Sequence, residues 1–521
     1  MMRHAAKIIF ATLIVAVLFF STAMCAEEKV VAKAIQYHPT DLRFGAKGVE
    51  GNPFLVDFSG EFVGPEGKTL KAPGFYDGGT TWVIRFAPSV PGVWTYRTAS
   101  SSPLLNGKTG KITAAANTSP VVHGRLRIDR QHPHHFIFED GTRYFLLGFE
   151  CDWIWALDTR DPNIPNLRRF VDVLVERGFN QIVTNVFAYD CSWSSGTTNQ
   201  WDYGPPPIYP WEGTNQQPNF ARMNLAFWQH YDRVVDYMFR KGMMAHIMLR
   251  VYNKMVKWPP NGSPEDDLYY RYAVARYGAY PHVIWDFSKE AHNEKDINYK
   301  LGIIAKIRKW DSYGNLITVH DDDRTYTSGT YDILDFRSDQ QHSKWGEKII
   351  AQREQRRWPI LNIEYGYERG VEDLPTYNVM QDWQEVLRRT YEIYCAGGYC
   401  AYYYSNAAWD LIKWDPEPPG WKRYRILRDF FEPTRWWGAD PHPELVLKGV
   451  AWCLADPGRE YIVFAPEGGE LLIRLAEGKQ YTITCLNPYT GEKMSLGKVE
   501  GGDCPINLQA GHPWVLLIAP K

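Results

Sequence analysis

The sequence predicts an α/β protein built around a (β/α)₈ TIM barrel, flanked by an N-terminal and a C-terminal β-sandwich. Over residues 130–437, apolar strand segments alternate with amphipathic helix segments, which is the pattern of parallel β/α units. Eight strands can be counted, and nearly all of them end in polar or aromatic residues. A TIM barrel brings all eight of these ends to one face, whereas a doubly wound sheet would gather its polar residues at one switch point. We therefore favour the barrel.

The N-terminus has the features of an export signal. A short basic start is followed by an unbroken apolar run over residues 8–20 and then by small and polar residues, as in a cleaved signal peptide. We assign residues 1–26 to this signal and expect an exported protein with no membrane segment after cleavage. Lipoprotein anchoring at Cys25 is disfavoured, because Met24 stands where a small residue is expected.

Two regions have the short alternating runs and turn residues of all-β structure. Residues 30–125 have the length of an immunoglobulin-like sandwich. Within them Trp82, Ile84 and Phe86 alternate with their neighbours as one buried face requires. The alternating pattern returns over residues 440–521, where "GREYIVFAPEGGELLIRL" is typical of a hairpin, so a second sandwich is predicted there.

Composition and charge narrow the class of partner. The chain has 58 basic and 60 acidic residues, for a formal charge of −2, so no overall field attracts nucleic acid. Aromatic residues make up 15% of the chain, including 21 Trp and 32 Tyr. Because the C–H faces of sugar rings stack on aromatic planes, this excess favours a carbohydrate partner. The oligomeric state is not indicated.

The eight cysteines lack the C-x-x-C spacing of a zinc site. Cys151 and Cys191 fall at the ends of neighbouring predicted strands. Export permits a disulfide between them, and two buried free thiols are the equal alternative.

Two glutamates occupy strand ends at a spacing that fits glycoside hydrolysis. "VIWDFSKE" places Glu290 just past strand four, and "PILNIEYG" places Glu364 at the end of strand seven. Retaining glycosidases need two carboxyl groups about 5 Å apart, and barrel enzymes carry their chemistry at this face. We predict Glu290 as acid/base and Glu364 as nucleophile, with no cofactor and no metal. Of the competing carboxylates, Asp286 is expected to form interior hydrogen bonds, and Glu368 could contact substrate.

Both segments resemble a known group of enzymes. "VIWDFSKE" is similar to the V-I-W-E-x-x-N-E segment of clan A glycoside hydrolases, and "PILNIEYG" is similar to their P-x-x-x-x-E-[FYW]-G segment. The resemblance implies the same roles for Glu290 and Glu364. More narrowly, the chain resembles bacterial apiosidase-like proteins, which combine an N-terminal β domain, a barrel and a C-terminal module of the collagen-binding type. "YIVFAPEGGELLIRL" and "CLNPYTGE" are similar to that module. The resemblance implies plant or algal cell-wall polysaccharide as substrate.

One residue departs from the clan pattern. Lys289 stands where the clan has an Asn that binds the 2-hydroxyl group of the substrate. Either the sugar contact differs, or another residue supplies it. A lysine beside the acid would lower the pKa of that acid, but adjacent strand positions point apart, so the assignment of Glu290 is kept.

The predicted substrate-binding residues share a position at the ends of the barrel strands, where polar side chains can fix sugar hydroxyls. They are Glu150, Asp152 and Trp153 after strand one, Tyr189 and Asp190 after strand two, Arg250 and Tyr252 after strand three, Lys289 after strand four, His320 and Asp321 after strand five, Gln341 and His342 after strand six, and Tyr404 with Asn406 after strand eight. Helix caps and salt links use the same residue types, so each of them could instead be structural.

Two other functions fit the same fold. A metal-dependent barrel hydrolase could use His246, His320, Asp321 and His342, but the close histidine pair that zinc barrels carry on strand one is absent. A secreted protein that only binds carbohydrate or matrix is the second alternative, since fold alone does not imply catalysis. Binding that survives replacement of both glutamates, without hydrolysis, would favour it.

Overall fold

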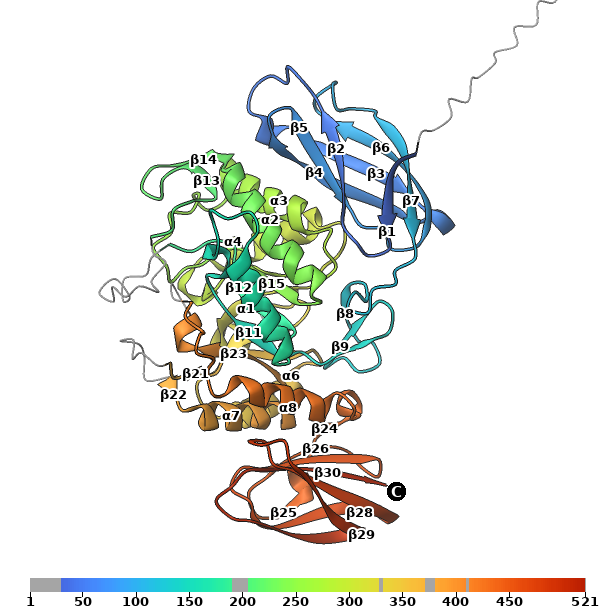
Figure 1. The fold of residues 1–521 in the computed structure, drawn as a ribbon, viewed down its shortest axis with the longest axis vertical. Helices are drawn as coiled ribbons and strands as arrows, with labels where there is room; N and C mark the ends of the chain where they lie inside the picture. The colour runs from blue at the N-terminus through green and yellow to red at the C-terminus, as the bar shows by residue number, and fades with distance from the viewer. Residues whose placement is uncertain (1–29, 190–204, 328–330, 371–379, 409–411, 521) are drawn as a thin grey trace, which may run out of the picture.

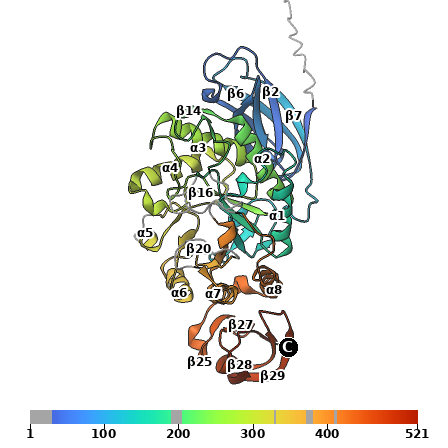
Figure 2. The ribbon, with the colours of Figure 1, turned by 60° about the vertical axis from the view of Figure 1, so that its left-hand side comes forward.

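The computed structural model describes residues 30–189, 205–327, 331–370, 380–408 and 412–520. The chain forms an N-terminal β region, a central α/β barrel and a C-terminal β region, with the barrel between the other two (Figures 1 and 2). The expected signal at residues 1–26 lies outside the described residues. Among the residues that are described, no helix combines the length and apolar character needed to cross a membrane.

The barrel is a nearly closed ring of parallel strands. In ring order the strands are β11 (Gly148–Glu150), β12 (Gln181–Asn185), β15 (Met244–Met248), β16 (Val283–Asp286), β17 (Ile317–Thr318) with β18 (His320–Asp322), β19 (Arg337–Gln340), β20 (Ile360–Glu364) and β23 (Tyr399–Tyr404). Spatial order follows chain order, and β23 pairs back onto β11. A doubly wound sheet would not pair its last strand with its first, so the TIM-like prediction is confirmed.

The fifth strand is divided into two pieces. β17 pairs with β16 and β18 pairs with β19, so the backbone ladder is interrupted between them. At the break the backbone N–H of His320 donates to Oδ1 of Asp286 at 3.0 Å. The buried carboxylate of Asp286 thereby satisfies a backbone group that the ladder leaves unpaired, which is the interior role expected for it.

Helices cover the ring on its outside. They are α1 (Pro165–Glu176), α2 (Leu225–Arg240), α3 (Pro264–Tyr277), α4 (Ile297–Trp310), α5 (Asp323–Thr327), α6 (Trp345–Gln355), α7 (Trp383–Cys395) and α8 (Trp421–Phe431). Local sequence sets where several of them begin: the side chain of Ser263 caps α3 and that of Asp296 caps α4, as residues of this type do at helix N-termini.

Short elements complete the chain. The single-turn helices are η1 (Pro53–Leu55), η2 (Pro65–Gly67), η3 (Ile154–Ala156), η4 (Ala291–Asn293), η5 (Ser405–Ala407), η6 (Trp436–Gly438) and η7 (Pro443–Leu445). The short strands are β8 (Leu126–Ile128), β9 (Phe136–Phe138), β10 (Arg143–Tyr144), β13 (Trp211–Gly213), β14 (Pro218–Met223), β21 (Tyr367–Glu368) and β22 (Met380–Gln381).

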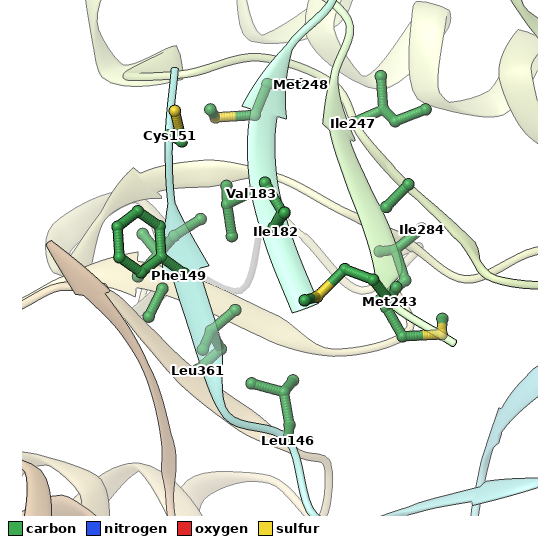
Figure 3. Close-up of a cluster of buried hydrophobic side chains, with 14 of the residues drawn as sticks. Leu146, Phe149, Cys151, Ile182, Val183, Met243, Ile247, Met248, Ile284 and Leu361 are labelled. Carbon is green, nitrogen blue, oxygen red and sulfur yellow. The ribbon is translucent and has the colours of Figure 1, made fainter. Parts of the chain in front are cut away.

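The strands are apolar because both of their faces are buried. Figure 3 shows Phe149 of β11, Ile182 and Val183 of β12, and Ile247 and Met248 of β15 packed in neighbouring positions. All five side chains are buried, as is usual where helices cover a parallel sheet. This packing fixes the strand ends, and therefore the side chains that follow them.

The N-terminal region is a seven-stranded sheet in the order β1-β7-β6-β3-β4-β5-β2. Its strands are β1 (Val30–Ile35), β2 (Thr40–Gly45), β3 (Phe58–Val63), β4 (Thr69–Gly78), β5 (Thr81–Phe86), β6 (Gly92–Ser100) and β7 (Thr109–Ala115). Trp82, Ile84 and Phe86 lie in this region's own core. The intervening Val83 is buried too, in the core it shares with the barrel, so β5 has two buried faces where the alternation predicted one.

The C-terminal region has the order β24-β26-β27-β30-β28-β25, with β29 paired on β28. Its strands are β24 (Asp440–Pro441), β25 (Val446–Lys448), β26 (Trp452–Asp456), β27 (Glu460–Ala465), β28 (Gly469–Leu486), β29 (Lys493–Leu508) and β30 (Trp514–Pro520). It packs on α7, where Tyr391 stacks on Phe464 with ring centroids 5.2 Å apart.

One glycine is required where this region meets the barrel. A Cβ atom at Gly346 in α6 would lie 2.4 Å from the ring of Trp452 in β26. We expect Gly346→Ala to destabilise the protein by about 1–3 kcal/mol, because overpacking outweighs the higher helix propensity of alanine. Gly302 in α4 has no atom within 4 Å of the same position, so Gly302→Ala should stabilise by about 0.5–1 kcal/mol. Urea unfolding of both variants checks this, and equal effects of the two substitutions would contradict it.

Candidate active site

Four charged side chains meet at the carboxyl ends of the barrel strands. The ammonium group of Lys289 donates to Oε1 of Glu150 at 2.6 Å and lies 3.5 Å from Oδ2 of Asp152 and 3.9 Å from Oε2 of Glu364. We call these four residues the buried ion cluster, because every side chain is at most 8% exposed. Lys289 also donates to the hydroxyl of Tyr403.

Electrostatics in this cluster keep the lysine charged. Burial alone would lower the pKa of Lys289, but the carboxylates of Asp152, Glu150 and Glu364 outweigh burial and raise that pKa. Burial raises the pKa of Glu150 well above its ordinary value; Lys289 lowers that pKa, and repulsion from Asp152 and Glu364 raises it. One cation therefore serves three carboxyl groups.

The two oxygens of Glu364 have different environments. Oε1 accepts a hydrogen bond from the hydroxyl of Tyr367 at 2.7 Å. Oε2 is buried without a hydrogen-bond partner and lies 3.8 Å from Nε2 of His320 and 3.9 Å from Nζ of Lys289. Glu364 is thus held through one oxygen, while the other keeps its lone pairs available for attack on an electrophile.

Glu290 lies directly after strand four with a left-handed backbone, at φ 49° and ψ 51°. This conformation is costly for a residue with a side chain and occurs preferentially at functional sites. Its Oε1 accepts from Nδ2 of Asn253 at 2.5 Å and its Oε2 accepts from Nδ2 of Asn293 at 3.1 Å. Lys289 is bound to Glu150, so the two neighbouring side chains do point to different partners, as the sequence predicts.

The environment of Glu290 favours its protonated form. Burial raises its pKa most, and the negative charge of Glu364 raises it further, whereas Lys289, Lys254 and His292 lower it. A general acid near neutral pH needs a carboxyl group with a raised pKa. The structure therefore pairs a carboxyl group inclined to be protonated with a carboxylate beside a lysine.

His320 adjoins the cluster as a neutral ring. Burial lowers its pKa well below the ordinary value, and the charge of Lys289 lowers it further. Its Nε2 lies 2.9 Å from Oε1 of Gln340, which places an N–H on that nitrogen. His320 therefore lies beside Glu364, with its Nε2 3.8 Å from Oε2, without adding a second positive charge.

Two predicted substrate-binding residues are engaged with the helical layer instead. Arg250 pairs with Asp266 of α3 at 3.3 Å and donates to the hydroxyl of Tyr299 in α4. Asp321 accepts from Lys300 of α4 at 3.2 Å. Both side chains are buried, so these ion pairs join strand ends to covering helices, and neither residue belongs to the buried ion cluster.

At the end of β19, the predicted residue Gln341 points away from the site, and its neighbour Gln340 points toward it. Gln341 donates to Gln352 of α6 at 3.0 Å, on the helical side, whereas Gln340 contacts His320. The pairing of β19 with β20 shifts register between Asp339 and Gln340. Such an irregularity changes the direction in which the following side chains point.

The same displacement by one residue occurs on β23. Tyr404 packs against Trp421 of α8, with ring centroids 5.9 Å apart. Tyr403 accepts the hydrogen bond from Lys289. Because strand residues alternate between faces, only one of two adjacent tyrosines can reach the barrel interior, and it is Tyr403.

The other predicted residues lie around the site, where Tyr252 donates its backbone N–H to the carbonyl oxygen of Lys289 at 3.4 Å. Trp153 is fully buried and stacks on Trp155, and Tyr189 stacks on Tyr209. Tyr252 lies beside Arg250, and His342 is exposed. The side-chain oxygen of Asn406 accepts a hydrogen bond from the hydroxyl of Ser405. Asp190 and Cys191 lie outside the described residues. Cys151 is a buried free thiol, and Glu368 accepts from Tyr402 and from the backbone N–H of Gly420.

Two histidines of the metal alternative, His246 and His320, contact protein partners. His246 contacts Gln181 through Nδ1 at 3.2 Å and Asp286 through Nε2 at 2.9 Å. Across the described part of the chain, no group of three or more His, Cys, Asp or Glu side chains is arranged to hold a metal ion.

Comparison with known proteins identifies the central region. Residues 130–439 match the model of the family described as apiosidase-like, catalytic domain. Residues 33–101 match a domain of unknown function, DUF5060. No curated protein matches the sequence.

Solved structures agree with the fold. A candidate glycoside hydrolase from Bacteroides vulgatus ATCC 8482 has a TM-score of 0.78 and 22% identity, over 94% of this chain and 100% of that one. A glycoside hydrolase family 5 protein from the same organism has a TM-score of 0.59 and 16% identity, over 78% and 95% of the two chains. At such identities these structures support the fold alone.

Proposed function

The chain belongs to the apiosidase-like family, and from this premise we propose that it is an exported retaining glycoside hydrolase acting on plant or algal cell-wall polysaccharide or its oligosaccharides. The observation that carries the proposal is the unlike pair of carboxyl groups at the barrel mouth. Glu290 has a raised pKa, and Glu364 has one oxygen without a hydrogen bond beside a lysine. Two carboxyl groups in contrasting environments are the requirement for double displacement.

In the proposed mechanism Oε2 of Glu364 attacks the anomeric carbon while Glu290 gives its proton to the departing glycosidic oxygen. A glycosyl ester on Glu364 results. Glu290, now ionised and held by Asn253 and Asn293, then takes a proton from water as that water attacks the anomeric carbon and the bond to Glu364 breaks, which frees Glu364 as a carboxylate. The sugar leaves with its original anomeric configuration, and both glutamates return to their first state.

The proposal also includes export through residues 1–26 and β-sandwich regions at 30–125 and 440–521 on either side of a catalytic domain at 130–437. Both β regions pack on the helices of the barrel. We expect them to brace the barrel.

The pH dependence should reflect the raised pKa of Glu290. The first step needs Glu290 protonated, so kcat/KM should fall as pH rises through its pKa. This basic limb should lie above the ordinary carboxyl range, because burial and the charge of Glu364 raise that pKa. Replacing Glu364 would itself abolish turnover, so Asn293→Ala is the informative variant. It removes a donor that favours the ionised form, and the basic limb should move to higher pH.

The direct test is hydrolysis of a panel of plant and algal glycans by the purified mature protein. The anomer first released is read by NMR before it equilibrates in water. Release with retained configuration supports the proposal, and the product names the sugar. An inverted product would contradict double displacement. Tight binding of a glycan without release would favour the alternative of a carbohydrate-binding protein.

A further inference from the structure

The buried ion cluster contains more negative groups than its single lysine can neutralise. Three carboxyl groups surround Lys289, whose side chain is 1% exposed. Burying charges costs several kcal/mol per ion unless good geometry offsets the cost. A fold can avoid such a cost with apolar residues, so an arrangement of this kind at the barrel mouth calls for a functional reason.

The contacts of Lys289 fix its ammonium group from one side. Glu150 accepts at 2.6 Å, Asp152 lies 3.5 Å away, and Tyr403 accepts a third contact. Glu150 ends strand one, Asp152 follows it, and Tyr403 lies on strand eight, so the ammonium group is held from across the ring from its own strand. The side chain of Lys289 therefore cannot move toward Glu364 without breaking these contacts.

The remaining distance to Glu364 suits a nucleophile. Nζ of Lys289 lies 3.9 Å from Oε2 of Glu364, which is beyond the range of a hydrogen bond but well within the range of strong charge attraction at a buried site. A direct hydrogen bond would occupy a lone pair and would have to be broken during attack. A charge held at this distance favours the ionised carboxylate and leaves its lone pairs accessible.

We infer that Lys289 is a positioning residue for the nucleophile: held by Glu150, Asp152 and Tyr403, it fixes a positive charge beside Glu364 and leaves Oε2 free to attack. The inference rests on the proposed function of Glu364. Lys289 takes no proton and forms no bond to substrate. The departure from the clan pattern at position 289 thus acts on the nucleophile rather than on a sugar hydroxyl.

The test separates this role from simple structural pairing. Lys289→Met alone leaves three buried carboxyl groups without a cation and could unfold the barrel. The double variant Lys289→Met/Glu150→Gln removes one positive and one negative charge with little change in volume, and Glu150→Gln is its matched reference. Against the wild type, whose net charge it shares, we expect the double variant to unfold at a similar urea concentration. Relative to Glu150→Gln, we also expect its kcat to be lower by about 10²-fold or more, as when a preorganised electrostatic contact is removed, and the acidic limb of its pH profile to move to higher pH.

An infrared measurement gives a readout that needs no turnover. The C=O stretch of protonated Glu364 is isolated as the difference between each protein and the same protein carrying Glu364→Gln. We expect this band to appear at higher pH in the double variant than in Glu150→Gln. If the band and the acidic limb stay in place, Lys289 is only a structural partner of Glu150 and the inference fails. If no glycan is hydrolysed by the wild type, the proposed function fails, and the infrared result still decides the role of Lys289.

Discussion

Glu364→Gln is expected to lower kcat by about 10⁴-fold or more while leaving the barrel folded. The substitution keeps the shape of the side chain and its contact with Tyr367, but an amide cannot form the glycosyl ester on which double displacement depends. Losses of this size are typical when the nucleophile of a covalent mechanism is removed. Initial rates on the best glycan of the panel measure the loss, and circular dichroism checks the fold.

Glu290→Ala should act on the same reaction in a distinguishable way. Loss of a general acid costs about 10²–10⁴-fold, and the cost should shrink for substrates whose leaving group needs no proton, such as aryl glycosides. Small anions separate the two roles. Azide can enter the space left in Glu364→Ala and give a glycosyl azide of inverted configuration, whereas in Glu290→Ala it should attack the glycosyl ester and give the retained product.

A buried carboxylate remote from the cluster serves as the control. Glu392 of α7 accepts from the backbone N–H of Gly346 and pairs with Arg388, so Glu392→Gln should change stability but leave kcat unaltered. Full activity in either Glu364→Gln or Glu290→Ala, or loss of activity in Glu392→Gln to the same extent, would overturn the assignment of the catalytic pair.

The barrel could be predicted from sequence because each strand is an apolar run between helices with clear polar faces. The division of strand five could not. "LITVHDDD" has the pattern of one continuous strand, and the break is tolerated only because Asp286, on the neighbouring strand, accepts the freed N–H of His320. A compensation supplied by a residue distant in sequence leaves no local signal.

The two glutamates could be placed because each follows an apolar strand within a recognisable segment. Which of the neighbouring side chains point into the barrel could not be predicted. "SDQQHS" and "AYYYSN" are polar or aromatic at consecutive positions, so no alternation identifies the inward residue. A register shift in the ladder of β19 selects Gln340, and the phase of β23 selects Tyr403. Asn253 lies in a loop and Tyr367 in the two-residue strand β21, which are too irregular or too short for periodicity to apply.

Asp232→Ala is expected to destabilise the folded protein by about 3–5 kcal/mol, the usual cost of removing one partner from a buried ion network. Asp232 on α2 pairs with Arg276 of α3 at 2.5 Å and with Arg85 of β5 at 3.3 Å. Both arginine side chains are at most 6% exposed. Removing the carboxylate therefore takes one anionic partner away from two buried guanidinium groups. These groups lie at the junction of the N-terminal region and the barrel.

The pH dependence of this effect has a definite sign. Burial would raise the pKa of Asp232, but Arg276 and Arg85 outweigh burial and lower that pKa. A carboxylate with a lowered pKa stabilises the fold fully above its unfolded value, near 4, and loses this contribution as pH falls through the folded value. The difference in unfolding free energy between wild type and Asp232→Asn should therefore be largest near neutral pH and shrink below about pH 4.

Urea unfolding followed by tryptophan fluorescence measures these free energies, and limited proteolysis shows whether the N-terminal region is released first. Asp503, paired with Arg474 at 2.9 Å on the exposed surface of the C-terminal region, gives the matched control. Removal of an exposed partner should cost less than about 1 kcal/mol, because water replaces it. If Asp232→Ala costs no more than Asp503→Ala, the junction is held by its apolar contacts, such as that of Val83 with the barrel core, and the ion network contributes orientation rather than stability.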